Sequence, residues 1–269
     1  MRRPRPIPKG TALVTGASSG IGYGYARRLA AMGYPLLLVS NEPERIEQTA
    51  RALAEEFGVE ASALCRDLCA PDAARELFDY CRKQRIEVEI LVNNAGIFFF
   101  DDLTEAGAGR IARMTDLHVR TVTLLCHYFG ARMKSRRHGY ILNMASMSAW
   151  LPYPGISVYA ASKSYLEKLS KALHNELRDH GVFVTAVCPG AVATDLYNLS
   201  SRYQRLALRL GIMMTPDRLA AKGLRAMFRR RKRVVPGAIN HVFLPLAAHI
   251  PSPLVRWIKR HAKFYRYGR

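Results

Sequence analysis

Apolar runs of four to seven residues alternate with longer stretches of helical periodicity along most of the chain. Apolar runs of this length predict strands, and the longer amphipathic stretches predict helices. The expected strands are residues 12–15, 35–40, 61–66, 90–93, 140–145 and 182–188, with a weaker one at 233–236. The expected helices are residues 20–32, 42–57, 71–85, 111–135, 158–180 and 217–229.

Continuously apolar strands that are separated by helices are typical of a parallel sheet with both faces covered. The expected fold class is therefore α/β, a Rossmann-type doubly wound parallel sheet in a single domain. In such folds the ligand lies at the carboxyl ends of the strands. We divide the chain into a basic N-terminal extension (residues 1–9), one folded domain (10–240) and a basic, aromatic C-terminal tail (241–269).

The composition supports one domain with a sizeable core, because 49% of the 269 residues are hydrophobic. No apolar stretch reaches the length of a bilayer span, and no secretory-type apolar segment follows the basic start, so we expect no signal peptide. The cysteines are odd in number and scattered, which fits neither a disulfide framework nor a metal site. Reduced thiols in the cytoplasm are the simplest interpretation. These cysteines are Cys65, Cys69, Cys81, Cys126 and Cys188.

The net charge of +20 lies entirely at the two ends of the chain. Residues 200–269 hold 17 Lys and Arg against one acid, Asp217, whereas residues 10–199 hold 20 of each sign. This distribution predicts a balanced body with basic appendages near an anionic partner. Trp257 and Tyr265 lie among basic residues of the tail, which suits an anionic membrane surface. A solvated basic surface is the alternative, and nucleic acid is less favoured because no recognised nucleic-acid motif is present.

The most informative pair of residues is Tyr159 and Lys163, which lie four positions apart on one face of a predicted helix. A free phenol has a pKa near 10, but a neighbouring ammonium group favours the phenolate and lowers that pKa. A shift of roughly three pKa units corresponds to about 4 kcal/mol. The pair therefore suits a general acid/base that acts on a hydroxyl or a carbonyl.

Four further motifs accompany this pair, each at or just after the end of a predicted strand. They are Thr15-Gly16-Ala17-Ser18-Ser19-Gly20-Ile21-Gly22, Asn93-Asn94-Ala95-Gly96, Ser146 thirteen residues before Tyr159, and Pro189-Gly190-Ala191-Val192-Ala193-Thr194. Together they resemble the short-chain dehydrogenase/reductase family, in order and spacing from about residue 9 to 194 and less specifically to about 237. The resemblance implies an oxidoreductase that transfers hydride between NAD(P) and a carbonyl or alcohol.

The resemblance also implies the cofactor site. The glycine-rich turn allows the backbone to approach a pyrophosphate at a helix N-terminus. Asp67 and Leu68 would contact the adenine, although Asp67 is equally suited to cap the following helix. Tyr159 and Lys163 would also reach the nicotinamide ribose. The other expected cofactor residues are Thr15, Gly16, Ser18, Ser19, Gly20, Ile21, Gly22, Asn94, Ala95 and Gly96, with Pro189, Gly190, Val192 and Thr194 at the nicotinamide.

The choice between NAD and NADP depends largely on the end of the second strand. Ser40 stands where NAD-using members place Asp, and Asn41 stands where NADP-using members often place Arg. Because no acid at these two positions repels a 2′-phosphate, the sequence favours NADP, with NAD as the alternative.

The resemblance gives the catalytic roles. Ser146, rather than the nearby Ser148, would bond the substrate oxygen, Tyr159 would exchange the proton, and Lys163 would lower the pKa of Tyr159. His118 replaces an asparagine that supports a proton path to the lysine in the family. Its imidazole could carry that relay, alter the pH dependence as a second cation near Lys163, or simply pack.

The substrate is expected to be apolar, such as an acyl-chain, lipid or sterol-like compound. Leu199, Tyr203, Leu206 and Leu210 share one helix face over the expected lid (198–214), and residues 98–100 would add an apolar wall. Ordinary core or dimer packing is the alternative. The family implies a homodimer or homotetramer through helices 111–135 and 158–180. A non-catalytic dinucleotide-binding regulator and a membrane-surface interaction protein remain as rival functions.

Overall fold

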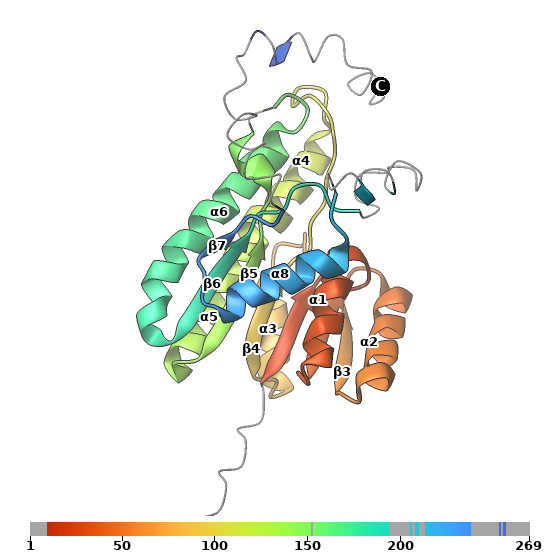
Figure 1. Ribbon diagram of the computed structural model, residues 1–269, viewed down its shortest axis with the longest axis vertical. Coiled ribbons are helices and arrows are strands. Elements are labelled where there is room, and N and C mark those ends of the chain that lie inside the picture. Colours follow the sequence, from red (N-terminus) through yellow and green to blue (C-terminus); the bar gives the residue numbers. More distant parts are fainter. Residues whose placement is uncertain are drawn as a thin grey trace, which may run out of the picture.

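The structure is a computed structural model that describes residues 10–151, 153–193 and 213–237, together with 205, 208, 209, 253, 255 and 256. A parallel sheet forms its middle layer (Figure 1), in the strand order β3-β2-β1-β4-β5-β6-β7. The strands are β1 (Thr11–Thr15), β2 (Leu36–Ser40), β3 (Ala61–Cys65), β4 (Val88–Asn93), β5 (Gly139–Met144), β6 (Val182–Val187) and β7 (Arg233–Val234). All seven predicted strands are present, with ends shifted by one or two residues, and β7 is only two residues long.

Helices cover both faces of the sheet because successive strand residues point to opposite sides. In β1, Ala12 and Val14 enter one core and Leu13 enters the other. The first core holds α1 (Gly20–Ala31), α2 (Pro43–Phe57) and α8 (Pro216–Phe228). The second holds α3 (Ala73–Lys83), α5 (Val122–Arg136) and α6 (Ser157–Leu177). The doubly wound α/β prediction is confirmed.

The helix predicted at 111–135 is wrong as one continuous α-helix. It consists of α4 (Ala108–Thr115), a π-helical turn η1 (Asp116–Thr121) and α5. The π turn buries both Leu117 and His118, and such turns are frequent at functional sites. Two 3₁₀ turns also occur, η2 (Met147–Trp150) after β5 and η3 (Arg178–His180) after α6.

The strand order reverses between β1 and β4, and this switch point positions the site. The Thr15 hydroxyl donates to the carbonyl of Val92 at 3.2 Å and accepts the N–H groups of Asn94 and Ala95, each at 3.0 Å. The Asn94 side chain donates back to the carbonyl of Thr15 at 3.0 Å. The ends of β1 and β4 are therefore fixed against each other.

A buried polar chain extends this support to α6. The Asn93 amide donates to Asn143 Oδ1 at 2.8 Å, and the Asn143 amide donates to the Ser170 hydroxyl at 2.9 Å. All three side chains are buried. Because a broken bond would leave a buried polar atom unpaired, this chain fixes β4, β5 and α6 relative to one another. Among the described helices, none is both long and apolar enough to cross a membrane.

Candidate active site

A cleft of about 490 Å³ opens at the carboxyl ends of the strands. All but four of the predicted site residues line it, from the glycine-rich turn after β1 to Tyr159 and Lys163 on α6. Thr15, Gly22 and His118 do not line the cleft but contact residues that do. Thr194 lies outside the described residues, as does most of the predicted lid. The fold therefore brings distant motifs to one site.

The glycine-rich turn is shaped by close backbone approach. Gly16 and Gly20 have φ values of +64° and +55°, a region that side chains with a Cβ rarely occupy. A Cβ on Gly22 would overlap the carbonyl oxygen of Gly16 and lie 2.6 Å from Asn94 Nδ2. The turn leads directly into α1, whose first backbone N–H groups offer hydrogen bonds to an anion. These features fit a dinucleotide pyrophosphate.

At the other end of the cleft, Lys163 is buried, and its Nζ donates to the carbonyl of Met144 at 2.9 Å. Burial lowers the pKa of Lys163 to about 8, so the ammonium form still predominates at neutral pH. The Nζ atom lies 5.5 Å from the centroid of the Tyr159 ring. An ammonium at this distance in a poorly solvated site favours negative charge on the phenol.

Ser146 lines the cleft, and its hydroxyl accepts the backbone N–H of Ser148 at 3.1 Å. Ser148 is also buried, but it does not line the cleft. The proton on Ser146 Oγ is free to turn toward a ligand while the oxygen accepts that bond. Of the two serines, Ser146 is therefore the one that lines the cleft.

His118 is held as a neutral imidazole. Its Nε2 accepts the backbone N–H of Ile97 at 3.1 Å and therefore carries no proton. Its Nδ1 lies 3.0 Å from the Ser162 hydroxyl, which itself donates to the carbonyl of Tyr159. Burial, with a smaller effect from the charge of Lys163, lowers the pKa of His118 well below 6.5. Of the possibilities that the sequence leaves open for His118, a second cation near Lys163 is therefore not supported, because both ring nitrogens are already engaged as in the neutral form.

We expect His118→Asn to leave the acidic limb of the kcat/KM profile unmoved near pH 6.5, since the imidazole has no proton to lose there. Stability should respond differently. As pH falls below 6.5, the unfolded chain takes up a proton on His118 and the folded chain does not. The unfolding free energy of the wild type should fall relative to the variant, by at most about 1.4 kcal/mol per pH unit. Urea unfolding of both proteins at several pH values measures this, and parallel curves would contradict a neutral imidazole.

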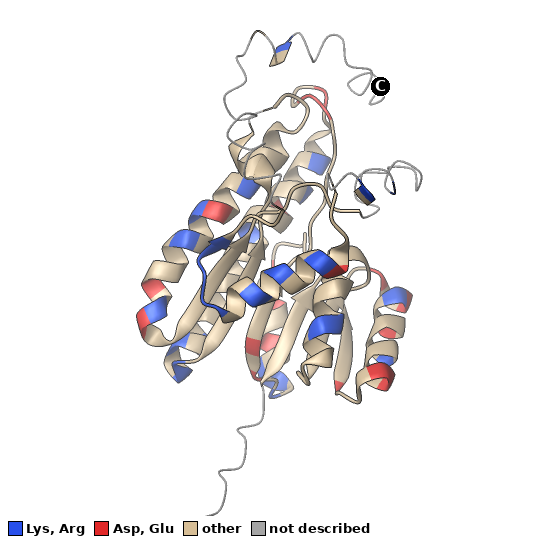
Figure 2. Cartoon of the chain, viewed as in Figure 1, with Lys and Arg blue, Asp and Glu red and all other residues tan. Residues whose placement is uncertain are grey.

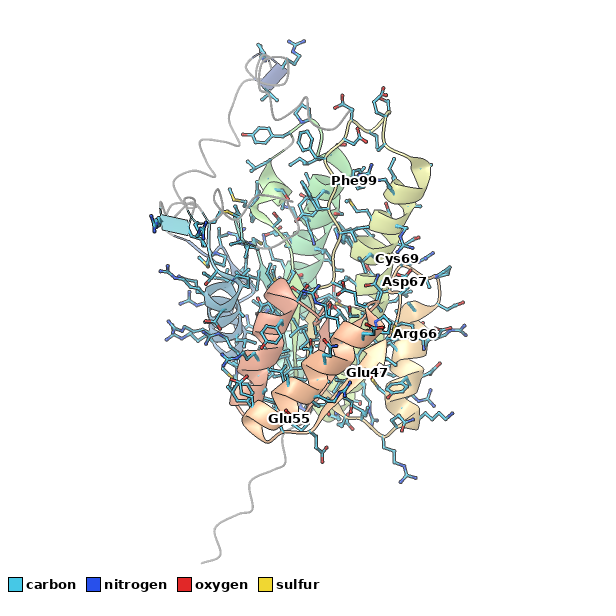
Figure 3. The ribbon with its side chains drawn as sticks, turned by 90° about the vertical axis from the view of Figure 1, so that its right-hand side faces the viewer. Glu47, Glu55, Arg66, Asp67, Cys69 and Phe99 are labelled. Carbon is cyan, nitrogen blue, oxygen red and sulfur yellow. The ribbon has the colours of Figure 1, made fainter. Side chains whose placement is uncertain are left out.

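Asp67 follows β3 at the opposite end of the cleft (Figure 3). Its Oδ1 accepts the N–H of Cys69 at 2.9 Å, and its Oδ2 accepts from Arg113 at 3.1 Å. These interactions, the Cys69 bond first, lower the pKa of the carboxyl group. The alternative of a helix cap is wrong, because α3 begins at Ala73 with Asp72 as its N-terminal cap residue. Asp67 instead closes a short turn and lines the cleft.

Three charged residues of the cleft escaped the sequence interpretation, namely Glu42, Arg66 and Arg113. Glu42 lies two residues beyond the end of β2, directly before the first residue of α2. The sequence shows this acid close to the end of the predicted strand, but a comparison restricted to positions 40 and 41 misses it. Arg113 lies on α4, and only the fold brings it to Asp67.

Comparison with known proteins identifies the family. A model described as short chain dehydrogenase matches residues 10–204. The chain belongs to the short-chain dehydrogenase family. Two human relatives are the very-long-chain 3-oxoacyl-CoA reductase, 33% identical over 195 residues, and the inactive hydroxysteroid dehydrogenase-like protein 1, 31% identical over 192 residues. Each alignment covers 69% of this dehydrogenase chain, but only 60% and 56% of the respective relatives.

Solved structures agree with this family. A short-chain dehydrogenase from Sphingobium yanoikuyae in complex with NADPH superposes with a TM-score of 0.77 at 30% identity, covering 90% of this chain and 97% of the other. The likeness extends over nearly the whole length of that enzyme, whereas the chain spans under two thirds of the curated relatives. Residues 10–204, which the family model matches, include every residue that lines the cleft.

Proposed function

We propose that this short-chain dehydrogenase transfers hydride between a nicotinamide cofactor and a carbonyl or alcohol substrate. One observation carries the proposal: a single cleft has the glycine-rich turn at one end and Ser146, Tyr159 and Lys163 at the other. When bound, the cofactor supplies the hydride. The protein has to orient the two reactants and exchange one proton.

The catalytic roles follow from the surroundings of each side chain. Ser146 donates to the substrate oxygen from the cleft wall. Tyr159 gives its proton to that oxygen in reduction and takes it back in oxidation, a general acid/base role. Lys163 keeps a positive charge near the phenol, and its bond to the carbonyl of Met144 fixes its position. His118 is a positioning residue, because it bonds the Gly96–Ile97 turn and Ser162 rather than anything in the cleft.

The cofactor is NAD or NADP, and the uncharged Ser40 and Asn41 favour NADP. The bound NADPH in the Sphingobium relative supports this preference. The glycine-rich turn suits a pyrophosphate because its backbone packs closely against the end of β4. A Cβ at Gly16 would lie 2.9 Å from the Cα of Ala95 and would prevent this close packing. Asp67 and Leu68 line the end of the cleft where an adenine would lie.

The substrate proposal is an apolar ketone or alcohol, such as an acyl-chain, lipid or sterol-like compound. Phe98 packs edge-on against the Tyr159 ring at 5.0 Å, which places an apolar aromatic side chain next to the proposed proton donor. The next two residues are also aromatic: Phe99 packs against the guanidinium of Arg110, and Phe100 fills the space beside Gly155. The very-long-chain 3-oxoacyl-CoA reductases among the relatives act on substrates with long apolar chains according to their names.

A panel of short-chain, long-chain and steroidal carbonyl compounds, each with NADPH and with NADH, tests the function. We expect oxidation of the reduced cofactor that depends on an apolar carbonyl and is fastest with the longer compounds. If the chain binds the cofactor but reduces none of the carbonyl compounds, the non-catalytic regulator is supported instead. One human relative is named as inactive. The presence of Ser146, Tyr159 and Lys163 in the cleft argues against that alternative.

A second proposal is that the protein associates with anionic membrane surfaces. Arg218, Lys222 and Arg225 lie on one face of α8 by the helical repeat, and Arg229 follows at the C-terminal cap position. In the described part of the chain, none of these four cations forms an ion pair with an acid. Figure 2 shows this basic stripe continuing into the segment after α8. The basic tail proposed as the main contact lies largely outside the described residues. Each cation near an anionic leaflet contributes about 1 kcal/mol.

We expect the triple variant Arg218→Gln, Lys222→Gln, Arg225→Gln to bind phosphatidylserine vesicles roughly a hundredfold more weakly than the wild type. The matched control removes three exposed cations elsewhere, with Arg51→Gln, Arg75→Gln and Arg82→Gln. Co-sedimentation with vesicles measures both, alongside a truncation at about residue 237. Equal binding by the two triple variants would contradict a role for the α8 face, and preferential binding to DNA would favour nucleic acid instead.

The oligomeric state and location are also proposals. The outer face of α6 exposes Ala161, Tyr165, Lys168 and Ala172, and the two alanines beside the exposed tyrosine suit helix packing between two copies. We therefore infer a homodimer or homotetramer, which light scattering on the full chain tests. The five cysteines are all free thiols, which supports a cytoplasmic location. The basic residues of α8 support peripheral membrane contact.

A further inference from the structure

The two edges of the sheet differ in how they are protected from pairing with another chain. β7 forms one edge with only two residues, of which Arg233 is charged. β3 forms the other edge with five residues, and none of them is charged or a proline. Each of the five is exposed or half-buried, and the pairing with β2 keeps one continuous register. Charges, prolines, bulges and short length are the usual means of protecting an edge, and β3 has none of them.

The outer edge of β3 presents backbone groups that have no strand beside them in the described part of the chain. On its inner edge, the Leu36 N–H donates to the carbonyl of Glu60, and the Arg66 N–H donates to the carbonyl of Ser40, each at 2.8 Å. The backbone groups of successive residues alternate between the two edges of a strand, so the even-numbered residues bond β2. The N–H and C=O groups of the odd-numbered residues of β3 therefore point outward.

These outward groups allow two β3 strands to pair antiparallel about Ala63. In that register, Ala63 faces its own counterpart, and Ala61 faces Cys65 of the second copy. Each such pair can exchange two N–H···O bonds, because both of its members direct their backbone groups outward. The side chains of these pairs are small, so they leave room for close approach.

The same register is complementary in charge at both ends of the strand. It places the exposed Glu60 directly opposite Arg66 of the second copy, and the symmetry repeats this contact. Opposite charges in such cross-strand positions stabilise a sheet. Arg66 already pairs with Glu76 through Nη1, but a guanidinium has five donors and can bond a second carboxylate.

We propose that β3 is an interface with a second copy of this chain, in which the two β3 strands pair antiparallel about Ala63 and join the two sheets into one. The two-fold axis through Ala63 makes the interface self-complementary, as a closed dimer requires. β3 and α6 lie on opposite sides of the molecule (Figure 1), so this interface is separate from the helix packing inferred above. Both interfaces together produce a tetramer, and the β3 pairing alone produces a dimer.

Site-specific cross-linking of the full chain tests the register. Ala63→Cys in a Cys65→Ser background places two Cα atoms about 5.5 Å apart across the two-fold axis, within reach of a disulfide. Cys65 is the one exposed thiol among the five cysteines, so the background removes the competing reaction. We expect most of this protein to become a covalent dimer under mild oxidation.

The matched control is Ser62→Cys in the same background. Ser62 is the exposed neighbour of Ala63 on the same strand. In the proposed register its two copies lie on a diagonal, with Cα atoms about 7–8 Å apart, which is too far for a disulfide. We therefore expect little covalent dimer from this variant.

A further variant adds a protective charge to the edge. Ser62→Lys brings two ammonium groups onto that diagonal, and we expect it to weaken the self-association of the full chain by about tenfold. Sedimentation velocity over a series of protein concentrations measures this. The control is Gln48→Lys, which adds the same charge at an exposed position of α2.

Preferential cross-linking of Ala63→Cys, together with weaker association of Ser62→Lys, would support the β3 interface. Equal cross-linking of the two cysteine variants would indicate random collisions and would overturn it. A wild type that remains monomeric at every concentration, or a Ser62→Lys variant that associates as strongly as Gln48→Lys, would also overturn it. None of these measurements requires turnover, so the result is independent of the proposed function.

Discussion

Tyr159→Phe is expected to lower kcat for carbonyl reduction by about a thousandfold, within the range typical of a lost general acid. The substitution removes only the hydroxyl that gives the proton to the substrate oxygen. The ring remains, and its packing against Phe98 and the neighbouring His118 should keep the local structure intact. The dissociation constant of the dinucleotide should therefore change by no more than about twofold, because the hydroxyl is one contact among many along the cleft.

The control for this variant is Tyr165→Phe on the same helix. Tyr165 is 37% exposed on the outer side of α6, and its hydroxyl lies 2.8 Å from that of Thr123. We expect this variant to lose a surface hydrogen bond and to keep its turnover. Steady-state kinetics on both variants, with cofactor binding measured in parallel, separate proton transfer from packing. Substantial carbonyl reduction by Tyr159→Phe would remove the tyrosine from the mechanism.

Gly22→Ala is expected to weaken dinucleotide binding by at least about a hundredfold and to lower the melting temperature. The added methyl group meets backbone and a hydrogen-bonded amide rather than a flexible side chain, since the Gly16 carbonyl and Asn94 Nδ2 occupy its position. Overpacking of this kind costs about 1–3 kcal/mol or more when the backbone has to move. The movement would also break the bonds from Asn94 to Thr15 and Gly16, which hold the turn against β4.

Gly109→Ala provides the comparison. Gly109 lies in α4 with a negative φ, and no atom lies within 4 Å of an added Cβ. Alanine is the better helix former by up to about 1 kcal/mol, so this variant should be as stable as the wild type or more so. Calorimetry and fluorescence titration on the pair measure both effects. Equal cofactor affinity in Gly22→Ala and the wild type would show that the close approach of the turn is not required.

The inner strands of the sheet were predictable because they are buried on both faces and therefore largely apolar, as in residues 36–39 of β2. The glycine-rich turn was predictable for a similar reason, since the close approach at Gly22 excludes every other residue. These features are local, and each is determined by a few consecutive residues. Their order along the chain then places them at one end of the sheet.

The features that escaped prediction depend on contacts between distant segments. The π turn at Asp116–Thr121 follows from packing that buries both Leu117 and His118, and no periodicity in the sequence marks it. The neutral state of His118 depends on Ile97 and Ser162, which are 21 and 44 residues away. The side chain of Glu42 accepts a hydrogen bond from Ser18, 24 residues earlier, a contact that only the fold creates. The role of each of these residues depends on its contacts with distant segments, which the residue type alone does not reveal.

The most direct test of the central claim follows the hydride itself. The wild type is incubated with NADPH or NADH that carries deuterium on the transferable position of C4, together with a long-chain or steroidal ketone, and the product is examined by mass spectrometry. The account predicts an alcohol with one deuterium on the carbinol carbon and a cofactor that has lost it. Bound cofactor with no deuterated alcohol from any carbonyl compound in the panel would contradict the claim that this cleft catalyses hydride transfer.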